Sequence, residues 1–445
     1  MSISSSNTVA VLGGGISGLS TAWYLKKKGF EVTLFEAAKE TGGVIKSEVN
    51  KHSVFDFGPN TIRDKTGAVS EMIAELGLED EVLSMSEGSK NRFIVRNGEL
   101  KNIKQNPISF LFSDVLSRKG KKELFSEPFK KVLKSDTDES IGSFLERRIG
   151  KEAVHYLADP FFSGIYAGNI YSMSKQKLIG KLTDFEQEYG SISKGFLKSR
   201  KEKRSFKPRV ISFKKGVQQL TDELSDHLQD SIHYEEIEAV HILENGFKLN
   251  TVQKEYNFDN VVCCLPSYVL KEVLKTGHQE LKGCLSEIIY SPMLSTQLVY
   301  KKEYLNLPEN GFGFLVPRKE NTRVLGAIWK SNIFPEQTED EYVHVNLMTG
   351  GSHDLKVTDQ DIREIEKEVI EEFSAIMNVK AGAEMVSSKL WENAIPQFHV
   401  GYASIDSEID KFQEVNTGFY IGGNYRWGVS VSDCVDRAKK LSDFI

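Results

Sequence analysis

The chain has 445 residues, a formal net charge of −6 at pH 7 and a sequence pI near 6.0. That length allows two or three domains and a sizeable buried core, and the mild negative charge gives no reason to expect nucleic acid as a partner. The four cysteines are Cys263, Cys264, Cys284 and Cys434. They show no CxxC spacing and no partnering histidines. We therefore expect reduced, mostly buried thiols of a cytosolic protein, rather than disulfides or a metal site.

The N-terminal residues show no targeting pattern. A glycine loop begins at Gly13, which leaves no room for a signal peptide before it, and residues 1–8 form only a short polar lead-in. No uninterrupted apolar stretch is long enough to span a bilayer. We expect a cytoplasmic protein that is soluble or attached to a membrane only peripherally.

The first forty residues have the pattern of a dinucleotide-binding unit. Residues 9–12 form a short apolar run typical of a buried parallel strand. The sequence GGGISG follows, then a helix that Gly29 ends, and then a second strand over residues 31–36. Strand, glycine loop, helix, strand and terminal acid therefore occur in the required order.

Each position in this unit has a physical role. Gly13 permits the tight turn, Gly15 lets the backbone approach a pyrophosphate, and Gly18 lets the helix pack on the strand. The N–H groups at the helix start bind the anion, and Glu36 is placed to accept hydrogen bonds from the ribose. The expected cofactor contacts here are Gly13, Gly14, Gly15, Ile16, Ser17, Gly18, Glu36 and Ala37.

Further glycine-rich turns favour FAD over NAD. A second glycine pair, Gly42-Gly43, follows the ribose-binding acid, as in flavoproteins whose chain doubles back along the cofactor. Another glycine loop follows an apolar run at residues 419–421, so loops at both ends of the chain predict one long cofactor held from both sides. The additional expected FAD contacts are Gly42, Gly43, Val44, Phe57, Gly58, Pro59, Asn60, Gly423, Asn424, Val429, Ser430 and Val431.

The predicted secondary structure changes twice in the middle of the chain. Residues 91–98 predict a hairpin with an Asn-Gly turn, and residues 101–204 have helical spacing with few strand signals. The basic run 198–209 predicts a solvated connector, with attraction to anionic lipid headgroups as the alternative. Strands dominate from about residue 290 to 347, in one mixed or antiparallel sheet, and a helix over residues 361–377 follows. A closing helix is predicted over residues 429–444, with its first amides facing the flavin or the pyrophosphate.

These elements predict an α/β protein of three parts. A Rossmann-like FAD-binding domain is discontinuous in sequence and comprises residues 1–85, 205–275 and 390–445. A mixed-sheet substrate-binding domain comprises residues 86–100 and 276–389. A helical insertion domain, which could associate with a membrane, comprises residues 101–204.

Several segments resemble those of the protoporphyrinogen oxidase family, a branch of the flavin amine oxidase superfamily. They are residues 13–19 (GGGISGL), 36–43 (E-x-x-x-x-x-G-G), 55–60 (FDFGPN), 91–93 (NRF), 159–168 (DPFFSGIYAG), 391–398 (WENAIPQF) and 423–434. The resemblance spans nearly the whole chain, and its mid-chain segments are more specific than the glycine loop because generic amine oxidases lack them. One departure is Glu40-Thr41, which stands where the family has a basic residue.

The resemblance implies a substrate site on the second domain. Arg92 corresponds to an arginine that binds a substrate propionate, a task suited to a planar, permanently charged guanidinium. Leu315 and Ile328 correspond to aliphatic residues that sandwich the macrocycle, and Met348 to a residue stacking near a ring. Gly168 lies where the chain approaches the substrate closely.

Three other positions complete these expectations. Ile237 and Trp391 complete the expected FAD contacts. Arg96 lies on the same face as Arg92 and is expected to face solvent.

The implied reaction is the oxidation of protoporphyrinogen IX to protoporphyrin IX in heme biosynthesis. Three two-electron rounds each pass a hydride to flavin, and dioxygen reoxidises the flavin and yields hydrogen peroxide. Because flavin carries this chemistry, no His/Asp/Ser or paired-carboxylate constellation is needed. None is found in the sequence, so no catalytic side chain is expected.

Three alternatives stay open at this point. The first is oxidation of coproporphyrinogen III to coproporphyrin III, whose substrate carries four propionates instead of two. The second is another amine or carotenoid oxidoreductase of the superfamily, and the third is a catalytically silent carrier with the same fold. Besides the porphyrinogen and dioxygen, the expected partners are a membrane surface, a ferrochelatase that receives the product, and a second copy in a homodimer.

Overall fold

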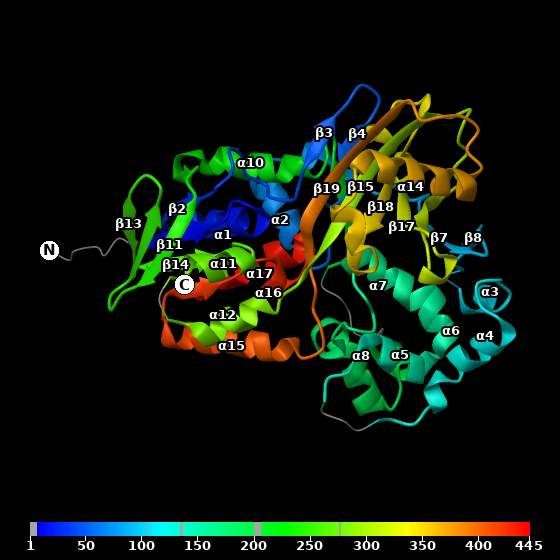
Figure 1. Ribbon diagram of the computed structural model, residues 1–445, viewed down its shortest axis with the longest axis horizontal. Coiled ribbons are helices and arrows are strands. Elements are labelled where there is room, and N and C mark those ends of the chain that lie inside the picture. Colours follow the sequence, from blue (N-terminus) through cyan, green and yellow to red (C-terminus); the bar gives the residue numbers. More distant parts are fainter. Residues whose placement is uncertain (1–6, 105, 134–136, 200–205, 276) are drawn as a thin grey trace.

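The computed structural model describes residues 7–104, 106–133, 137–199, 206–275 and 277–445. It is an α/β structure with parallel and mixed sheets, as the sequence predicts. Figure 1 shows a parallel sheet with its helices on the left, a larger sheet with α14 at the upper right, and a helical segment at the lower right.

A five-stranded parallel sheet forms the centre of the first part, in the order β10-β2-β1-β14-β20. Its strands are β1 (Thr8–Leu12), β2 (Glu31–Phe35), β10 (Ile232–His233), β14 (Asn260–Cys263) and β20 (Phe419–Ile421). The four residues from Val9 to Leu12 are all 0% exposed, because helices cover both faces.

Alternate side chains of this sheet enter two different cores. Val9 and Val11 pack against α1 (Ile16–Lys27), α10 (Gln218–Leu228) and α17 (Val431–Ser442). Ala10 and Leu12 face the other core, with α11 (Ser267–Val273), α12 (Gln279–Ser286) and α15 (Tyr402–Val415). The period of two along β1 therefore divides the two layers.

The second part is a mixed sheet of seven strands, in the order β19-β15-β18-β17-β16-β7-β8. Its strands are β7 (Asn91–Arg96), β8 (Glu99–Asn102), β15 (Tyr290–Lys301), β16 (Gly311–Leu315), β17 (Val324–Trp329), β18 (Tyr342–Gly350) and β19 (Met385–Pro396). Only the β16–β7 pairing is parallel among these neighbours. Helix α14 (Ile362–Met377) covers one face, and its apolar residues form a core with that face.

Helices occupy most of the chain between β8 and β9 (Arg209–Phe213). They are α3 (Pro107–Leu111), α4 (Arg118–Phe125), α5 (Ile141–Ile149), α6 (Lys151–Ala153), α7 (Asp159–Tyr166), α8 (Lys175–Tyr189) and α9 (Ile192–Ser199). Because apolar residues of α5, α7 and α8 meet in a core of their own, this segment packs as a unit.

Short elements complete the fold. The remaining strands are β3 (Ser47–Val49), β4 (Val54–Asp56), β5 (Ile62–Asp64), β6 (Val82–Ser84), β11 (Ile237–Ile242), β12 (Phe247–Thr251) and β13 (Glu255–Phe258). The remaining α-helices are α2 (Ala68–Glu75), α13 (Lys330–Ile333) and α16 (Asn424–Trp427).

The predicted hairpin is confirmed at β7 and β8. Asn97 and Gly98 both have positive φ, 54° and 73°, as a two-residue turn between twisted strands requires. The predicted helical insertion and the mixed sheet are also present. Strand β19 and helix α15 have no counterpart among the predicted elements.

The structure also bears on the predictions about the cysteines and about membrane-spanning segments. All four cysteines are free, with Cys263 and Cys434 buried and the other two half-buried. Within the described residues, every helix is too short or too polar to cross a bilayer. Much of the basic run 198–209 lies outside the described residues.

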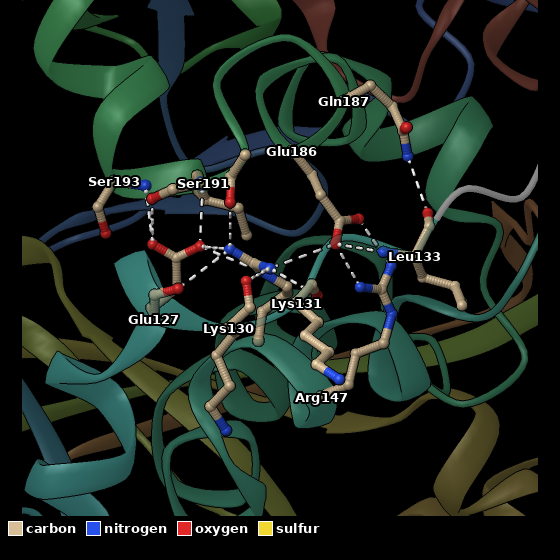
Figure 2. A network of polar contacts seen from close by, with 12 residues as sticks. Glu127, Lys130, Lys131, Leu133, Arg147, Glu186, Gln187, Ser191 and Ser193 are labelled. Atoms are coloured by element: carbon tan, nitrogen blue, oxygen red, sulfur yellow. Dashed lines mark hydrogen bonds and ion pairs between the residues drawn. The ribbon is translucent and has the colours of Figure 1, made fainter.

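A buried charge network joins four parts of the helical segment (Figure 2). Arg148 of α5 is 0% exposed and donates to Glu127, which is 1% exposed, and to Glu186 of α8 at 3.3 Å. Glu127 also accepts the backbone N–H groups of Ile192 and Ser193, at 2.9 and 3.1 Å, and so caps α9. One arginine therefore ties the loop before α5 to α8 and α9.

Glu127 is ionised because of these donors. Burial alone raises the pKa of this carboxyl, but hydrogen bonds from Arg148, Ser191, Ser193 and Ile192 outweigh burial and lower the pKa to about 2. The pKa of the folded state thus lies below that of the unfolded chain. The stabilisation is fully present above about pH 4.5 and is lost as the pH falls towards 2.

We expect Arg148→Met to loosen the helical segment. The substitution leaves the carboxylates of Glu127 and Glu186 buried with fewer donors, which costs about 3–5 kcal/mol for a buried pair that loses one partner. Hydrogen exchange measured by mass spectrometry should rise in peptides from α5 and α9. The control is Arg118→Met on the exposed surface of α4. Equal exchange in the two variants would contradict the role given to Arg148.

Candidate cofactor and substrate site

Three loops meet at the carboxyl edge of the parallel sheet, and two of them contain glycine. Gly13 follows β1 with φ of 98°, and a Cβ atom on it would lie 3.3 Å from the backbone of Cys264, which follows β14. Gly422, after β20, donates its N–H to the carbonyl of Cys263 at 2.8 Å. Because ligands bind at this edge in open parallel sheets, the loops mark one binding site.

The first loop leaves the start of α1 open to an anion. Gly15 is the N-cap residue; no side chain caps the helix, and the first turn has no acidic residue. A Cβ atom on Gly15 would meet nothing within 4 Å, whereas one on Gly18 would lie 1.8 Å from the carbonyl oxygen of Gly13. Gly18 therefore allows close packing. Gly15, Ile16 and Ser17 present backbone at the positive end of the helix, where a phosphate binds.

Glu36 is held at the end of β2 by two backbone donors. Gly14 N–H donates to Oε2 at 2.7 Å, and Ala38 N–H donates to Oε1 at 2.8 Å. Both carboxylate oxygens keep a free lone pair for a ribose hydroxyl. Ala37 is exposed beside Glu36, while Ile237 is 7% exposed and lies in the core that Leu12 also enters.

The second glycine pair lies against the first loop. Gly42 donates its N–H to the carbonyl of Gly14 at 2.8 Å, and a Cβ atom on Gly43 would lie 3.3 Å from the Cα of Gly15. The chain thus doubles back along the first loop. Glu40, which stands where the family has a basic residue, pairs with Lys46 at 2.5 Å.

The last glycine loop leads into two helices. Gly423, with φ of 92°, precedes Asn424 at the start of α16. Ser430 caps α17, because its side chain accepts the N–H of Asp433 at 3.1 Å. The predicted helix from residue 429 is therefore shorter, since Val429 and Ser430 precede its first residue, Val431.

Residues 57–60 form the junction between the two parts of the structure. Trp391 Nε1 on β19 donates to the carbonyl of Phe57 at 2.9 Å, and Asn346 Nδ2 on β18 donates to Asn60 Oδ1 at 2.9 Å. Gly58 packs against Val44, because a Cβ atom on Gly58 would lie 2.0 Å from the Val44 carbonyl oxygen. Pro59 lies between these contacts and is half-buried.

The four side chains expected to bind substrate share one face of the seven-stranded sheet. Leu315 and Met348 both pair with Gly326, and Ile328 and Arg92 both pair with Gly313. Residues directly opposite each other in a sheet point to the same side.

The two faces of this sheet differ in exposure. Phe314, Ala327 and Leu347 on the other face are buried in the core that contains α14. Leu315 and Ile328 are half-buried, and so is Met348. Leu315 and Ile328 pack partly against small apolar clusters, and all three side chains remain partly accessible.

Helix α7 and the loop after it close this space. A Cβ atom on Gly164 would lie 2.7 Å from a methyl group of Leu315. A Cβ atom on Gly168 would lie 2.5 Å from Gln397 Oε1 and 2.8 Å from Met173 Sδ. A side chain at position 168 would therefore have to displace the ends of the Gln397 and Met173 side chains, in addition to any substrate that approaches there.

Arg92 has no anionic partner in the part of the chain that the structure describes. Its guanidinium lies 3.9 Å from the centre of the Phe312 ring and donates to the carbonyl of Ser89 at 2.9 Å. Burial lowers the pKa of Arg92, although an arginine stays charged at neutral pH. A half-buried cation without a counter-ion favours an anionic ligand.

Arg96 does not face solvent, contrary to expectation. It donates to Glu152 at 2.9 Å and to the carbonyl of Val115, and it lies over the Tyr156 ring. The four-residue spacing puts both arginines on one face, but the helical insertion supplies a carboxylate only to Arg96.

Two features of the site were missed from the sequence. The side of the seven-stranded sheet that contacts residues 56–60 is polar at its centre, at Ser295, Gln297, His344 and Asn346. The signal was present as alternating polar residues in strands that are otherwise apolar. The second feature is Arg318, which pairs with Asp159 at 2.9 Å beside the segment resembling the family.

The loops fit FAD by their own geometry. An uncapped helix start with open space at Gly15, a carboxylate held by two amides, and a doubled glycine pair supply sites for a pyrophosphate and a ribose. FAD would be held by these loops and by residues 57–60, and it would supply two-electron chemistry beside the Arg92 face.

This combination of fold and site defines a flavin-dependent oxidoreductase. The model of the family "Flavin containing amine oxidoreductase" matches residues 16–443. The chain belongs to that family and is an FAD-dependent enzyme.

The resemblance read from the motifs is confirmed by the relatives. Protoporphyrinogen oxidase 2 of Arabidopsis thaliana is 29% identical over 479 residues, covering 99% of this chain and 94% of the relative. Coproporphyrinogen III oxidase of Bacillus subtilis (strain 168) is 24% identical, with 97% and 96% covered. A crystal structure of a candidate protoporphyrinogen oxidase from Exiguobacterium sp. 255-15 has the same fold, with a TM-score of 0.86, 20% identity, and 99% and 98% covered.

Proposed function

We propose that this enzyme oxidises a porphyrinogen, with protoporphyrinogen IX as the substrate and dioxygen as the acceptor. The observation that carries the proposal is the unpaired guanidinium of Arg92 at the edge of an apolar face formed by Leu315, Ile328 and Met348. An apolar macrocycle with carboxylates at one edge matches this arrangement. The names of the relatives support the same substrate class.

The proposed reaction needs positioning more than acid–base groups. Bound FAD supplies the redox step: three rounds remove six hydrogens from the porphyrinogen and pass them to three dioxygen molecules, which become three hydrogen peroxide molecules. Arg92 would hold a propionate by charge-assisted hydrogen bonds. Leu315, Ile328 and Met348 would hold the macrocycle against the flavin and exclude water.

Coproporphyrinogen III is the second candidate, because one relative is named for it. Its four propionates would call for cations around the whole macrocycle. Three nearby cations are already paired, Arg96 with Glu152, Arg318 with Asp159 and Lys330 with Asp56. These pairings favour protoporphyrinogen IX, whose two propionates lie at one edge.

The two substrates can be distinguished directly. We expect the purified enzyme to oxidise protoporphyrinogen IX faster than coproporphyrinogen III at equal concentration, because among the described residues Arg92 alone offers a guanidinium without an anionic partner on the face. Porphyrin fluorescence measures both rates, and peroxide release identifies dioxygen as the acceptor. A rate for coproporphyrinogen III that is higher by orders of magnitude would reverse the choice of substrate but keep the reaction type.

Arg92→Met should weaken substrate binding and leave FAD in place. A lost hydrogen-bonded charge contact costs about 1.5–3 kcal/mol, which corresponds to a KM increase of roughly 10- to 100-fold. The matched control is Arg96→Met on the same strand, which loses a contact with Glu152 and should keep the KM. If Arg92→Met keeps its KM as well, Arg92 does not bind the substrate.

We infer that this enzyme is cytoplasmic and touches a membrane surface through its helical segment. Residues 101–204 contain 21 Lys and Arg against 13 Asp and Glu, although the whole chain is acidic. The same segment exposes Phe112 by 85%, Phe129 by 87% and Leu197 by 64%. Apolar side chains among lysines suit an anionic lipid surface. Transfer of the product to a ferrochelatase remains a prediction, and so does the formation of a homodimer.

Sedimentation with lipid vesicles tests this contact. We expect binding to vesicles that contain phosphatidylglycerol and weaker binding to phosphatidylcholine alone, because the segment is cationic. Phe129→Ser should reduce binding, whereas Val415→Ser, at a position 82% exposed on α15, should not. Equal sedimentation with and without vesicles would exclude the proposed contact.

A further inference from the structure

Four backbone carbonyls of residues 56–60 accept hydrogen bonds from side chains. Gln297 Nε2 donates to the Asp56 carbonyl at 2.8 Å, and Trp391 Nε1 donates to the Phe57 carbonyl at 2.9 Å. Asn60 Nδ2 donates to the Gly58 carbonyl at 3.3 Å, and Lys330 Nζ donates to the Asn60 carbonyl at 3.4 Å. Three of these donors come from the substrate-binding sheet or the helix that follows β17. A cofactor-facing loop is therefore positioned by the other domain.

A chain of hydrogen bonds with a single direction leads to the same loop. His344 Nε2 donates to Gln297 Oε1 at 2.8 Å, and Gln297 Nε2 donates to Ser295 Oγ at 3.0 Å. Ser295 Oγ then donates to Asn346 Oδ1 at 3.0 Å, and Asn346 Nδ2 donates to Asn60 Oδ1 at 2.9 Å. The last member, Asn60, donates to the Gly58 carbonyl. Each polar group both donates and accepts, so the links reinforce one another.

The first member of this chain is a neutral histidine. Burial, helped by the charge of Lys330, lowers the pKa of His344 well below its usual range. Gln297 uses its amide N–H groups on Asp56 and Ser295, so its oxygen accepts from His344 Nε2–H. His344 Nδ1 then accepts from the hydroxyl of Ser53 at 2.7 Å. The Gln297 amide, which Asp56 and Ser295 orient, therefore fixes both the tautomer of His344 and the direction of the later links.

A buried ion pair anchors the other end of the loop. Lys330 Nζ lies 2.7 Å from Asp56 Oδ2, and the two side chains are 0% and 1% exposed. The second oxygen, Asp56 Oδ1, accepts from Ser47 Oγ at 2.5 Å and from the N–H of Val217 at 2.9 Å. Asp56 thus joins β3, the start of α10 and the substrate-binding domain.

Stability alone does not account for so many buried polar groups. Apolar side chains of similar volume would fill the same space without the desolvation that buried ions and amides require. Polar groups, unlike apolar ones, fix direction as well as distance. They specify where the carbonyls of residues 56–60 point, and so where this loop lies against the cofactor.

The geometry points to the chain from His344 to Asn60, with the Lys330–Asp56 pair, as a positioning device for the flavin. Ser295 and Asn346 lie opposite Met348 and Ile328 on the same face of the sheet, and they contact the loop beside the substrate residues. They act on the cofactor through Gly58 and Asn60. This inference rests on FAD as the cofactor. It does not depend on protoporphyrinogen IX being the substrate.

Ser295→Ala removes the middle link of the chain with the loss of one oxygen atom. We expect the Kd for FAD to rise about tenfold. Asn346 Oδ1 loses its buried donor, so Asn346 no longer holds Asn60 of the loop in a fixed position. The visible absorption band of the bound flavin should change in shape. The matched control is Ser388→Ala, which breaks a 2.9 Å bond to Thr296 in the same sheet but outside the chain.

A second variant separates positioning from folding. The double substitution K330M/D56N removes the ion pair without leaving a lone buried charge, and it should fold while showing the altered flavin band. Unchanged FAD affinity and band shape in Ser295→Ala, even with a lower melting temperature, would show a purely structural network and overturn the inference. Neither measurement involves a porphyrinogen, so this outcome is independent of the proposed function.

Discussion

The hydrogen bonds between residues 56–60 and the seven-stranded sheet hold the two halves of the site together. The parallel sheet presents its glycine loops at one edge, and that edge alone would define only a nucleotide site. Asn346, on the loop-facing side of the sheet, is opposite Ile328 in register and two residues from Met348 on the same strand. The contact that holds this loop therefore lies on the same face of the sheet as the apolar residues proposed to bind the substrate.

The sequence predicted the parts of the fold whose pattern is local. The glycine loop, the Asn-Gly hairpin and the helical insertion each have a signal within a few residues, and all three are present. Strand β19 was missed because its burial is intermediate along most of its length, so no alternation of apolar residues marks it. The motif at Trp391 was recognised for its resemblance and not for the strand that carries it.

The network around Asp56 and Lys330 could not be read from the sequence for a different reason. Its members are far apart in the chain, separated by 274 residues for the ion pair and 286 for Asn60 and Asn346. A lysine after an apolar strand is ordinarily expected at the surface. Only the packing of the two sheets shows that Lys330 is buried and paired, whereas Arg92 has no carboxylate partner in the described part of the chain.

Arg92 and Arg96 differ in the partners that the helical insertion supplies to them. Both arginines lie on one face of β7, and each is half-buried. The helical insertion places Glu152 beside Arg96 and no carboxylate, among the described residues, beside Arg92. A guanidinium kept from water without a counter-ion is costly unless a ligand supplies the charge. The insertion therefore neutralises Arg96 and leaves Arg92 available for the anionic edge of the proposed substrate.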